Sequence, residues 1–282
     1  MFWGGTFSAG RVVSQHLPPF SASFLRFFIA TVCLVYLVRK MEGRLPKINS
    51  DQIIQVFFLG LTGVFAYNAF FFTGLQTVEA GRAAVIVATN PILIALLAAL
   101  LFRDPLGFFK VLGILLSVFG AVLAITRGHP LHVLDQMISL GDLAIAGCVA
   151  SWAAYSILGK YSMARLSPQA AVTYSCIAGT LALFIPAIGE GLPASIIDIP
   201  LSVWGCLIYL GYFGTVLGFT WYYQAVKEIG PARASLFINF VPLFAIAAGY
   251  IFLQEAVDIS LIIGAVMVSS GVYLANRTRP KV

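Results

Sequence analysis

Charged residues are scarce in this chain: Asp, Glu, Lys and Arg account for 10% of its 282 residues, whereas 60% are hydrophobic. Soluble domains carry about 25% charged and about 45–50% apolar residues. The mean hydropathy of +0.95 points the same way. This composition excludes a soluble globular enzyme, a disordered tail and a disulfide scaffold, and it predicts a polytopic helical membrane protein.

The chain also lacks the side-chain clusters that metal, redox and catalytic sites need. Its four cysteines stand in apolar stretches without a CxxC pair or an adjacent histidine: Cys33, Cys148, Cys176 and Cys206. There is no HExxH motif, and all 11 acidic residues fall in connections or at span ends. We therefore expect no metal and no cofactor, and an intramembrane enzyme is only a remote alternative. Glu79 and His16 are the only weak candidates for proton coupling, so facilitated diffusion stays open.

Long apolar runs dominate the chain, and a membrane-spanning helix needs about 20 such residues. The runs are too long and unbroken for the alternating strands of a barrel. They predict an all-α polytopic fold with ten transmembrane helices, at residues 1–15, 20–38, 53–75, 83–102, 108–126, 142–160, 168–189, 202–226, 233–253 and 259–275.

The basic residues are distributed unevenly over the connections. Most of the 17 Lys and Arg residues lie on one side of the predicted bundle, whereas Arg11, Arg82 and Arg127 lie on the other. The positive-inside rule places the rich side, with both termini, in the cytoplasm. We expect a bacterial inner (plasma) membrane protein. No long soluble segment gathers basic residues, so we expect no nucleic-acid partner despite the net charge of +6.

The two halves of the chain resemble each other. A shift of 151 residues pairs Gly60 with Gly211, Gly63 with Gly214, Arg82 with Arg233, Pro91 with Pro242, Asp104 with Glu255, Gly113 with Gly264 and Gly120 with Gly271. Each half has five spans, and because five is odd the second half enters the membrane from the opposite side. Residues 1–127 and 142–276 are therefore predicted to be inverted repeats, an arrangement that many transporters use for alternating access.

The first predicted span is short. A shift of 149 residues pairs Trp3 with Trp152, which stands well inside its own span, whereas only two residues precede Trp3. At about 1.5 Å per residue, a span over residues 1–15 reaches only about 22 Å. We expect the native helix to begin about seven or eight residues earlier, so that Met1 is an internal residue.

Several short motifs resemble those of EamA domains. Residues 2–7 resemble the Trp-Gly start of these domains, and residues 25–28 resemble their Arg-centred second helix. Residues 80–84 before Asn90-Pro91 have a counterpart in residues 231–235 before Pro242, and Gln254-Glu255 with the following glycines resembles the closing pattern. The whole chain is thus similar to two tandem EamA repeats of the drug/metabolite transporter superfamily. This resemblance implies a ten-helix exporter of small metabolites, similar to the YddG-type amino-acid exporters, with spans five and ten at the periphery.

Polar and aromatic side chains within the other spans are the candidates for substrate contact, because such residues are costly in a bilayer unless they face protein or a cavity. The candidate binding residues are Trp3, Thr6, Arg26, Tyr67, Asn68, Asn90, Trp152, Tyr155, Ser156, Trp221, Tyr222 and Asn239. An aromatic pocket of this kind suits a hydrophobic or aromatic amino acid. An interfacial belt is the alternative for Trp221 and Tyr222, and an interhelical hydrogen bond is the alternative for the two asparagines.

Two features of the spans point to recognition of charged groups. Arg26 is the one cation within a span, and it is a candidate for binding a substrate carboxylate; snorkelling outward or pairing with a helix C-terminus are the alternatives. Pro91 and Pro242 lie near the middle of their spans, and each leaves the carbonyl four residues earlier, at Val87 and Ile238, without a donor. We expect symmetric kinks whose free carbonyls meet a substrate ammonium, with packing kinks as the alternative.

These observations favour a secondary transporter that moves a small molecule outward by alternating access, above all hydrophobic, aromatic and other neutral amino acids. Another small metabolite or a drug-like compound is the alternative. Nucleotide sugars would need several cations at the cavity, and organic cations would prefer an intramembrane carboxylate. The expected partners are the substrate and the lipid bilayer; a monomer is the expected state, although the sequence does not fix the oligomeric state. The turn residues Arg82, Arg233, Asp104 and Glu255 are expected to cap or gate helices rather than to contact substrate.

Overall fold

The computed structural model describes residues 2–102, 107–126, 128, 139–192 and 196–275. Within these ranges every regular element is a helix, and the helices form ten consecutive segments at the ten predicted spans. The prediction of an all-helical fold is confirmed. Met1, Asp104, Arg127 and the basic tail beyond residue 275 lie outside the described residues.

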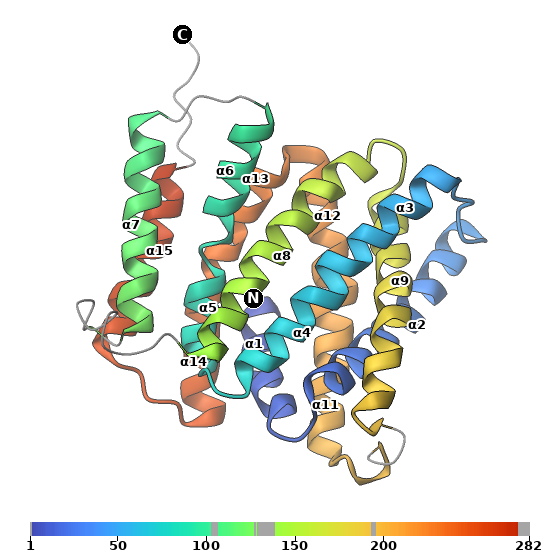
Figure 1. Cartoon of the computed structure of the whole chain (residues 1–282), viewed down its shortest axis with the longest axis horizontal. Coiled ribbons are helices and arrows are strands. Elements are labelled where there is room, and N and C mark those ends of the chain that lie inside the picture. The colour runs from blue at the N-terminus through green and yellow to red at the C-terminus, as the bar shows by residue number, and fades with distance from the viewer. Residues whose placement is uncertain (1, 103–106, 127, 129–138, 193–195, 276–282) are drawn as a thin grey trace.

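The helices of the first half run up and down the bundle in chain order (Figure 1). They are α1 (Phe2–Ser14), α2 (Pro19–Glu42), α3 (Ser50–Leu59) with the π-helix η1 (Gly60–Ala66) and α4 (Tyr67–Leu75), α5 (Ala80–Val87) with α6 (Asn90–Phe102), and α7 (Phe108–Ile125).

The second half repeats this order. Its elements are α8 (Leu140–Ser162), α9 (Pro168–Gly189), the 3₁₀ turn η3 (Ile196–Asp198), α11 (Leu201–Tyr209) with the π-helix η4 (Leu210–Leu217) and α12 (Gly218–Ile229), α13 (Pro231–Ala234) with the 3₁₀ helix η5 (Ser235–Phe240) and α14 (Val241–Leu253), and α15 (Ile259–Ala275). Among the described residues, six helical stretches are long and apolar enough to cross a membrane, and three shorter apolar helices accompany them.

Several helices begin where the sequence supplies a cap. Asn49 and Ser139 each accept a hydrogen bond from the backbone N–H three residues on, and the Gln52 and Asp142 side chains return the contact to the cap backbone. These capping boxes satisfy donors that a helix N-terminus otherwise leaves unpaired. Ser167 caps α9 in a similar way, with proline at the next position.

Each half has a π-helix in its third span, and the two correspond under the 151-residue shift. Glycines bring these segments against the second span of the opposite half. A Cβ at Gly60 would lie 2.8 Å from the Gly179 backbone N in α9, and one at Gly211 would lie 3.0 Å from the Arg26 carbonyl oxygen in α2. The wider π turns and the missing side chains therefore allow close approach between the two halves.

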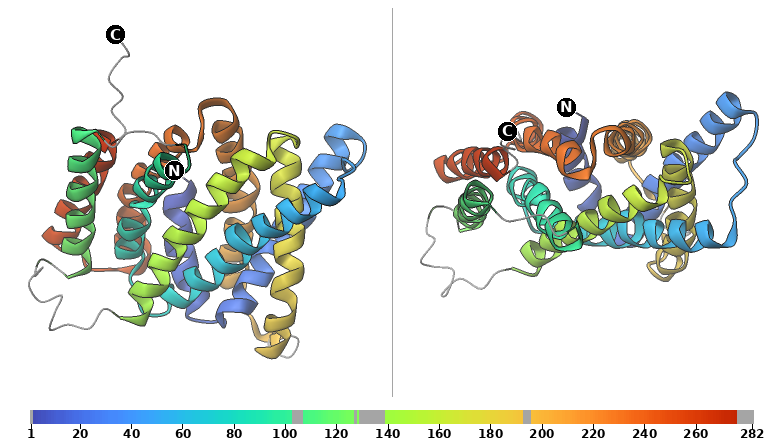
Figure 2. Two further views of the ribbon diagram at one scale, coloured as in Figure 1. Left: turned by 45° about the horizontal axis from the view of Figure 1, so that its top comes forward. Right: turned by 90° about the horizontal axis from the view of Figure 1, so that it is seen from above.

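Helices α7 and α15 stand side by side at one edge of the molecule (Figures 1 and 2). A Cβ at Gly113 would lie 2.4 Å from the carbonyl oxygen of Gly271, and one at Gly264 would lie 2.6 Å from that of Gly120. We call these four residues the glycine seam. The peripheral position matches the expectation for spans five and ten.

The other helices surround one buried core. Phe27, Phe71, Phe219 and Tyr155 are among its largest fully buried side chains. Large apolar side chains such as Tyr36 and Phe252 point outward and are 62% and 77% exposed. A helical bundle that is apolar on its outside as well as inside is suited to hydrocarbon rather than to water.

Candidate functional site

A small cavity lies among the central helices. Its volume is about 30 Å³, which holds a water molecule or two and is far too small for an amino acid. The cavity is lined by Trp3, Thr6, Phe7, Arg26, Tyr67, Phe71, Val87, Asn90, Trp152, Phe219, Ile238 and Val241. Two residues of its wall, Trp3 and Val241, also line a larger neighbouring cavity of about 540 Å³.

Aromatic rings form most of the cavity wall, with Trp152 of α8 at their centre. Its ring centroid lies 5.4 Å from those of Trp3 and Tyr67 and 5.0 Å from that of Phe219. The Trp3 Nε1–H donates to the Gly214 carbonyl oxygen in η4 at 2.9 Å. Such edge-on rings offer an apolar surface for an apolar side chain.

Arg26 of α2 is 3% exposed and faces this cavity. Its Nη1 donates to Asn68 Oδ1 at 2.9 Å, and its Nε donates to Thr215 Oγ1 at 3.3 Å. The guanidinium also lies 5.8 Å from the centre of the Phe71 ring. Within the described part of the chain, no carboxylate lies at ion-pairing distance from Arg26. The side chain does not snorkel outward, and its positive charge is held in the core by neutral groups.

Asn90, the first residue of α6, is fully buried at the cavity wall. Neither its Oδ1 nor its Nδ2 has a hydrogen-bond partner. Two other polar groups at the wall differ in this respect: the Thr6 hydroxyl donates to the Trp3 carbonyl oxygen at 2.6 Å, and Arg26 has the two partners above. An unpaired buried amide is unusual in a folded protein.

The two proline positions differ. Before Pro91 the helix is interrupted for two residues, and among the described residues no hydrogen bond reaches the Val87 carbonyl oxygen. Before Pro242 the chain forms the 3₁₀ helix η5, whose tighter turn brings the Val241 N–H onto the Ile238 carbonyl oxygen. The expectation of a symmetric pair of free carbonyls is therefore wrong for Ile238, because its carbonyl is satisfied three residues on rather than four.

Three predicted residues support the cavity without lining it. The Ser156 hydroxyl donates to the Trp152 carbonyl oxygen at 2.7 Å and lies 2.8 Å from the Tyr222 hydroxyl. The Tyr155 hydroxyl lies 3.3 Å from the Ser175 Oγ. Tyr155, Ser156 and Tyr222 therefore fix the backbone and ring around Trp152, and Asn68 fixes Arg26 in the same way.

Two predicted residues do not reach the cavity. Trp221 is 55% exposed and, with Trp3 and Tyr222, lines the neighbouring cavity instead. Asn239 lines an apolar groove between α14 and α15 instead. With about three residues per 3₁₀ turn, Ile238 and Val241 share the inward face of this segment and Asn239 is rotated outward.

Several lining residues were not anticipated from the sequence: Phe7, Phe71, Phe219 and Val241. Two of them carried a usable signal. Phe71 follows Tyr67 by one helical turn, and Val241 is the counterpart of Asn90 under the 151-residue shift. Thr215 was missed as well, since its partner Arg26 lies far away in the sequence. The described residues contain no group of three or more His, Cys, Asp or Glu side chains arranged to hold a metal ion.

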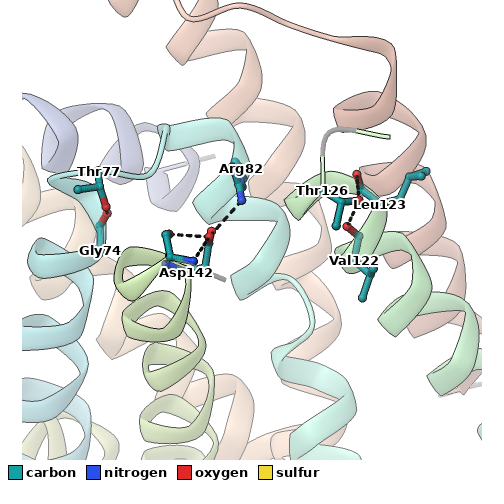
Figure 3. Close-up of polar contacts among 8 residues, drawn as sticks. Gly74, Thr77, Arg82, Val122, Leu123, Thr126 and Asp142 are labelled. Atoms are coloured by element: carbon teal, nitrogen blue, oxygen red, sulfur yellow. Dashed lines mark hydrogen bonds and ion pairs between the residues drawn. The ribbon is translucent and has the colours of Figure 1, made fainter. Parts of the chain in front are cut away.

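Polar contacts tie the two halves together at one end of the bundle, where α9 and α14 end. The Arg82 Nη2 contacts the Asp142 Oδ2 at 3.1 Å (Figure 3). The Glu255 carboxylate accepts from the Ala80 N–H at 2.9 Å and so caps α5. The Glu190 carboxylate caps α2, accepting from the Ser21 N–H at 2.6 Å. In all three contacts a carboxylate of the second half binds the first half.

Comparison with known proteins identifies the family. Matches to the "EamA-like transporter family" cover residues 1–126 and 139–277. The chain belongs to this family. The transporter is therefore a polytopic membrane protein of the drug/metabolite transporter type, and the resemblance drawn from its motifs is confirmed.

Relatives of this EamA-like transporter share its whole length. An uncharacterized transporter of Bacillus subtilis, YyaM, is 31% identical over 276 residues, covering 98% of this chain and 90% of that protein. An uncharacterized transporter of Archaeoglobus fulgidus is 29% identical, with 99% and 96% covered. A protein of Streptantibioticus cattleyicolor described as a probable terminal-alkyne amino-acid exporter is 25% identical, with 98% and 90% covered.

A solved structure shares the fold of this transporter. It superposes with a TM-score of 0.68 at 20% identity, covering 98% of this chain and 93% of the other, and it is described only as the crystal structure of a protein. The arrangement of helices is thus one already seen by experiment.

Proposed function

We propose that this EamA-like transporter exports amino acids, above all those with hydrophobic or aromatic side chains, by alternating access. Residues 1–127 and 142–276 act as inverted repeats that rock about the central cavity. The observation that carries the substrate class is Arg26, a buried cation that faces the cavity without a carboxylate partner among the described residues.

A buried charge needs compensation, because moving an ion from water into the protein interior costs on the order of several kcal/mol. Amide, hydroxyl and aromatic groups solvate Arg26 but do not neutralise it. A substrate carboxylate would neutralise it and would gain a charge-assisted hydrogen bond from the guanidinium. The same positive charge disfavours organic cations.

The aromatic wall supports the choice of side chain. Trp3, Trp152, Tyr67 and Phe219 offer ring edges and faces to whatever occupies the opened cavity. The relative in S. cattleyicolor is described as a probable exporter of a terminal-alkyne amino acid, which is an amino acid with an apolar side chain. We place the protein in a bacterial inner membrane with both termini in the cytoplasm, because most Lys and Arg residues lie on that side.

Counterflow in liposomes tests the proposal. Purified protein in liposomes loaded with unlabelled phenylalanine should take up labelled Phe, Trp, Met and Thr with saturation, and should ignore tetraphenylphosphonium. Arg26→Met should abolish this uptake. Arg39→Met, which removes an exposed charge from the end of the same helix, should leave it unchanged. Absence of saturable uptake for every amino acid would refute the proposed substrate.

Two further measurements address direction and coupling. Cells that express the protein should tolerate higher concentrations of the toxic analogue 4-fluorophenylalanine than cells that express Arg26→Met, since export lowers the internal concentration. An imposed pH gradient should leave uptake unchanged, because the acids of the described residues lie at span ends and in connections rather than at the cavity. Accumulation of the amino acid driven by the pH gradient would show that transport is coupled to protons and is not uniport.

A further inference from the structure

The Asn90 side chain is poised to bind a ligand. It is fully buried, it lies at the wall of the central cavity, and both atoms of its amide lack a partner. Folded proteins rarely leave a buried amide unpaired unless something else binds it. The residue opens α6 directly after the helix interruption, so its position is set by the break at Pro91.

A second acceptor lies beside Asn90 in the chain. Pro91 has no N–H to give to the Val87 carbonyl oxygen, and no hydrogen bond to that oxygen occurs among the described residues. Val87 also lines the cavity. Asn90 and Val87 therefore both line the cavity, and each carries an acceptor oxygen to which no donor is bonded among the described residues. A primary ammonium group, with three donors and no acceptor, matches such a pair.

The corresponding wall of the second half offers nothing similar. The counterpart of Asn90 under the 151-residue shift is Val241, which has no polar side-chain atom. The Ile238 carbonyl oxygen already accepts from the Val241 N–H. The cavity is thus asymmetric: α2 contributes a cation at Arg26, and the break between α5 and α6 contributes acceptors.

We propose that Asn90 is a specificity-determining residue that binds the α-ammonium group of the substrate, while Arg26 binds its carboxylate. The transporter then selects zwitterionic α-amino acids over carboxylates or amines of the same size. This assignment rests on the proposed function, and it adds the group that separates an amino acid from a simple organic acid.

Three ligands with one ring system test the assignment: phenylalanine, 3-phenylpropionate, which lacks the amine, and phenethylamine, which lacks the carboxylate. The wild-type protein should prefer phenylalanine to 3-phenylpropionate by at least about tenfold in kcat/KM, since a site built around a substrate N–H rejects the analogue without it. In Asn90→Leu this ratio should fall to about one, with 3-phenylpropionate uptake retained. Phenethylamine should stay excluded in both proteins because of Arg26.

Two further variants, Asn239→Leu and Asn90→Ser, distinguish a change in substrate preference from a loss of transport caused by misfolding. Asn239→Leu makes the same change in the α14–α15 groove and should keep the wild-type ratio. Asn90→Ser keeps a hydroxyl acceptor in less volume and should give an intermediate ratio. Retained uptake of 3-phenylpropionate shows in the same experiment that a variant is folded.

The possible failures are distinguishable. If the wild type takes up no amino acid, the proposed function and this assignment both fall. If the wild type takes up phenylalanine but Asn90→Leu lowers phenylalanine and 3-phenylpropionate uptake in equal proportion, amino-acid export stands and the ammonium assignment is overturned. A ratio that falls equally in Asn239→Leu overturns it as well.

Discussion

Replacing Arg26 with methionine should remove transport without destabilising the protein. An arginine at the centre of a membrane helix costs about 2.5–3.5 kcal/mol on insertion scales. Arg26 recovers part of this cost through its contacts with Asn68 and Thr215. Methionine abolishes the charge and fills much of the same volume, so the burial cost disappears with the guanidinium.

The opposing term comes from the groups that Arg26 leaves behind. Asn68 Oδ1 loses its donor, which costs about 1–3 kcal/mol for a buried polar atom. Thr215 keeps its bond to the Leu210 carbonyl oxygen, and its loss is smaller. The balance is a change in unfolding free energy between about −0.5 and 2.5 kcal/mol, where a positive value favours the variant. Adding Asn68→Leu removes the orphaned oxygen and should bring the gain to about 2–3 kcal/mol.

Arg82 supplies the matched control. Its guanidinium pairs with the Asp142 carboxylate, which is 4% exposed. Arg82→Met removes the cation from this buried carboxylate and leaves it only the hydrogen bonds from Ser139, a change that costs about 3–5 kcal/mol. The free energies of unfolding of Arg26→Met and Arg82→Met should therefore differ by several kcal/mol, on the order of the cost of a buried charge without its counter-ion. Arg82→Met should be the less stable of the two.

Unfolding in mixed micelles, followed with a thiol-reactive fluorophore, measures both variants. Cys148 and Cys176 are buried and should react only when the bundle opens, so the assay uses a background in which the half-buried Cys33 and Cys206 are replaced by serine. Phenylalanine should also raise the unfolding temperature of the wild type and not that of Arg26→Met, because a ligand stabilises only the state that binds it. Destabilisation of Arg26→Met by about 3–5 kcal/mol would refute the reasoning, since it would mean that Arg26 is a structural charge with a partner.

Two further predictions concern packing and the end contacts. Gly113→Ala should destabilise the protein by about 1–3 kcal/mol, because its Cβ would meet the α15 backbone at 2.4 Å. The control Gly205→Ala, which has open space around its Cβ, should stabilise the protein by up to about 1 kcal/mol through helix propensity. Unfolding by titration with SDS compares the two variants. Glu255→Gln should weaken the cap on α5 and so increase the rate at which an impermeant maleimide labels a cysteine placed at Ala80. An unchanged labelling rate would show that the Glu255 contact does not hold the start of α5 closed.

The positions of the spans were predictable because they depend on the length and hydropathy of each apolar run, which are properties of that segment alone. Ten apolar runs became ten helical segments, and the breaks fell near Pro91 and Pro242, where proline removes a donor. The form of each break was not predictable. The first is a two-residue interruption and the second is a 3₁₀ helix, and packing against other helices decides between them.

The composition of the site was harder to predict than its helices. A polar residue in a span predicts contact with the cavity, and this prediction holds for Asn90 and fails for Asn239. The prediction fails because the direction of a side chain depends on the helix type. The 3₁₀ winding of η5 turns the Asn239 side chain away from the cavity and into the α14–α15 groove. Glu190 shows a second limit: its role as a cap on α2 depends on two loops that meet only in the folded chain.

The backbone of the two halves is more symmetric than their side chains, and the difference has a functional reason. Alternating access by rocking needs similar helices in both halves, and the π-helices Gly60–Ala66 and Leu210–Leu217 occupy corresponding positions under the 151-residue shift. Recognition of a dipolar substrate needs the opposite. Under the 149-residue shift Arg26 corresponds to Ser175, whose hydroxyl lies 3.3 Å from that of Tyr155 rather than facing the cavity.

Asn90 and Val241 differ in the same sense, so the first half contributes both determinants, the cation and the amide, and the second half contributes neither. A symmetric cavity would bind a zwitterion equally well in two reversed orientations and would hold neither firmly. With the cation only in α2 and the free acceptors only at the α5–α6 break, one orientation is favoured and the apolar side chain is directed to the remaining wall, around Trp152. On the proposed function, the asymmetry of the side chains is what makes a scaffold of two similar halves selective for one orientation of the substrate.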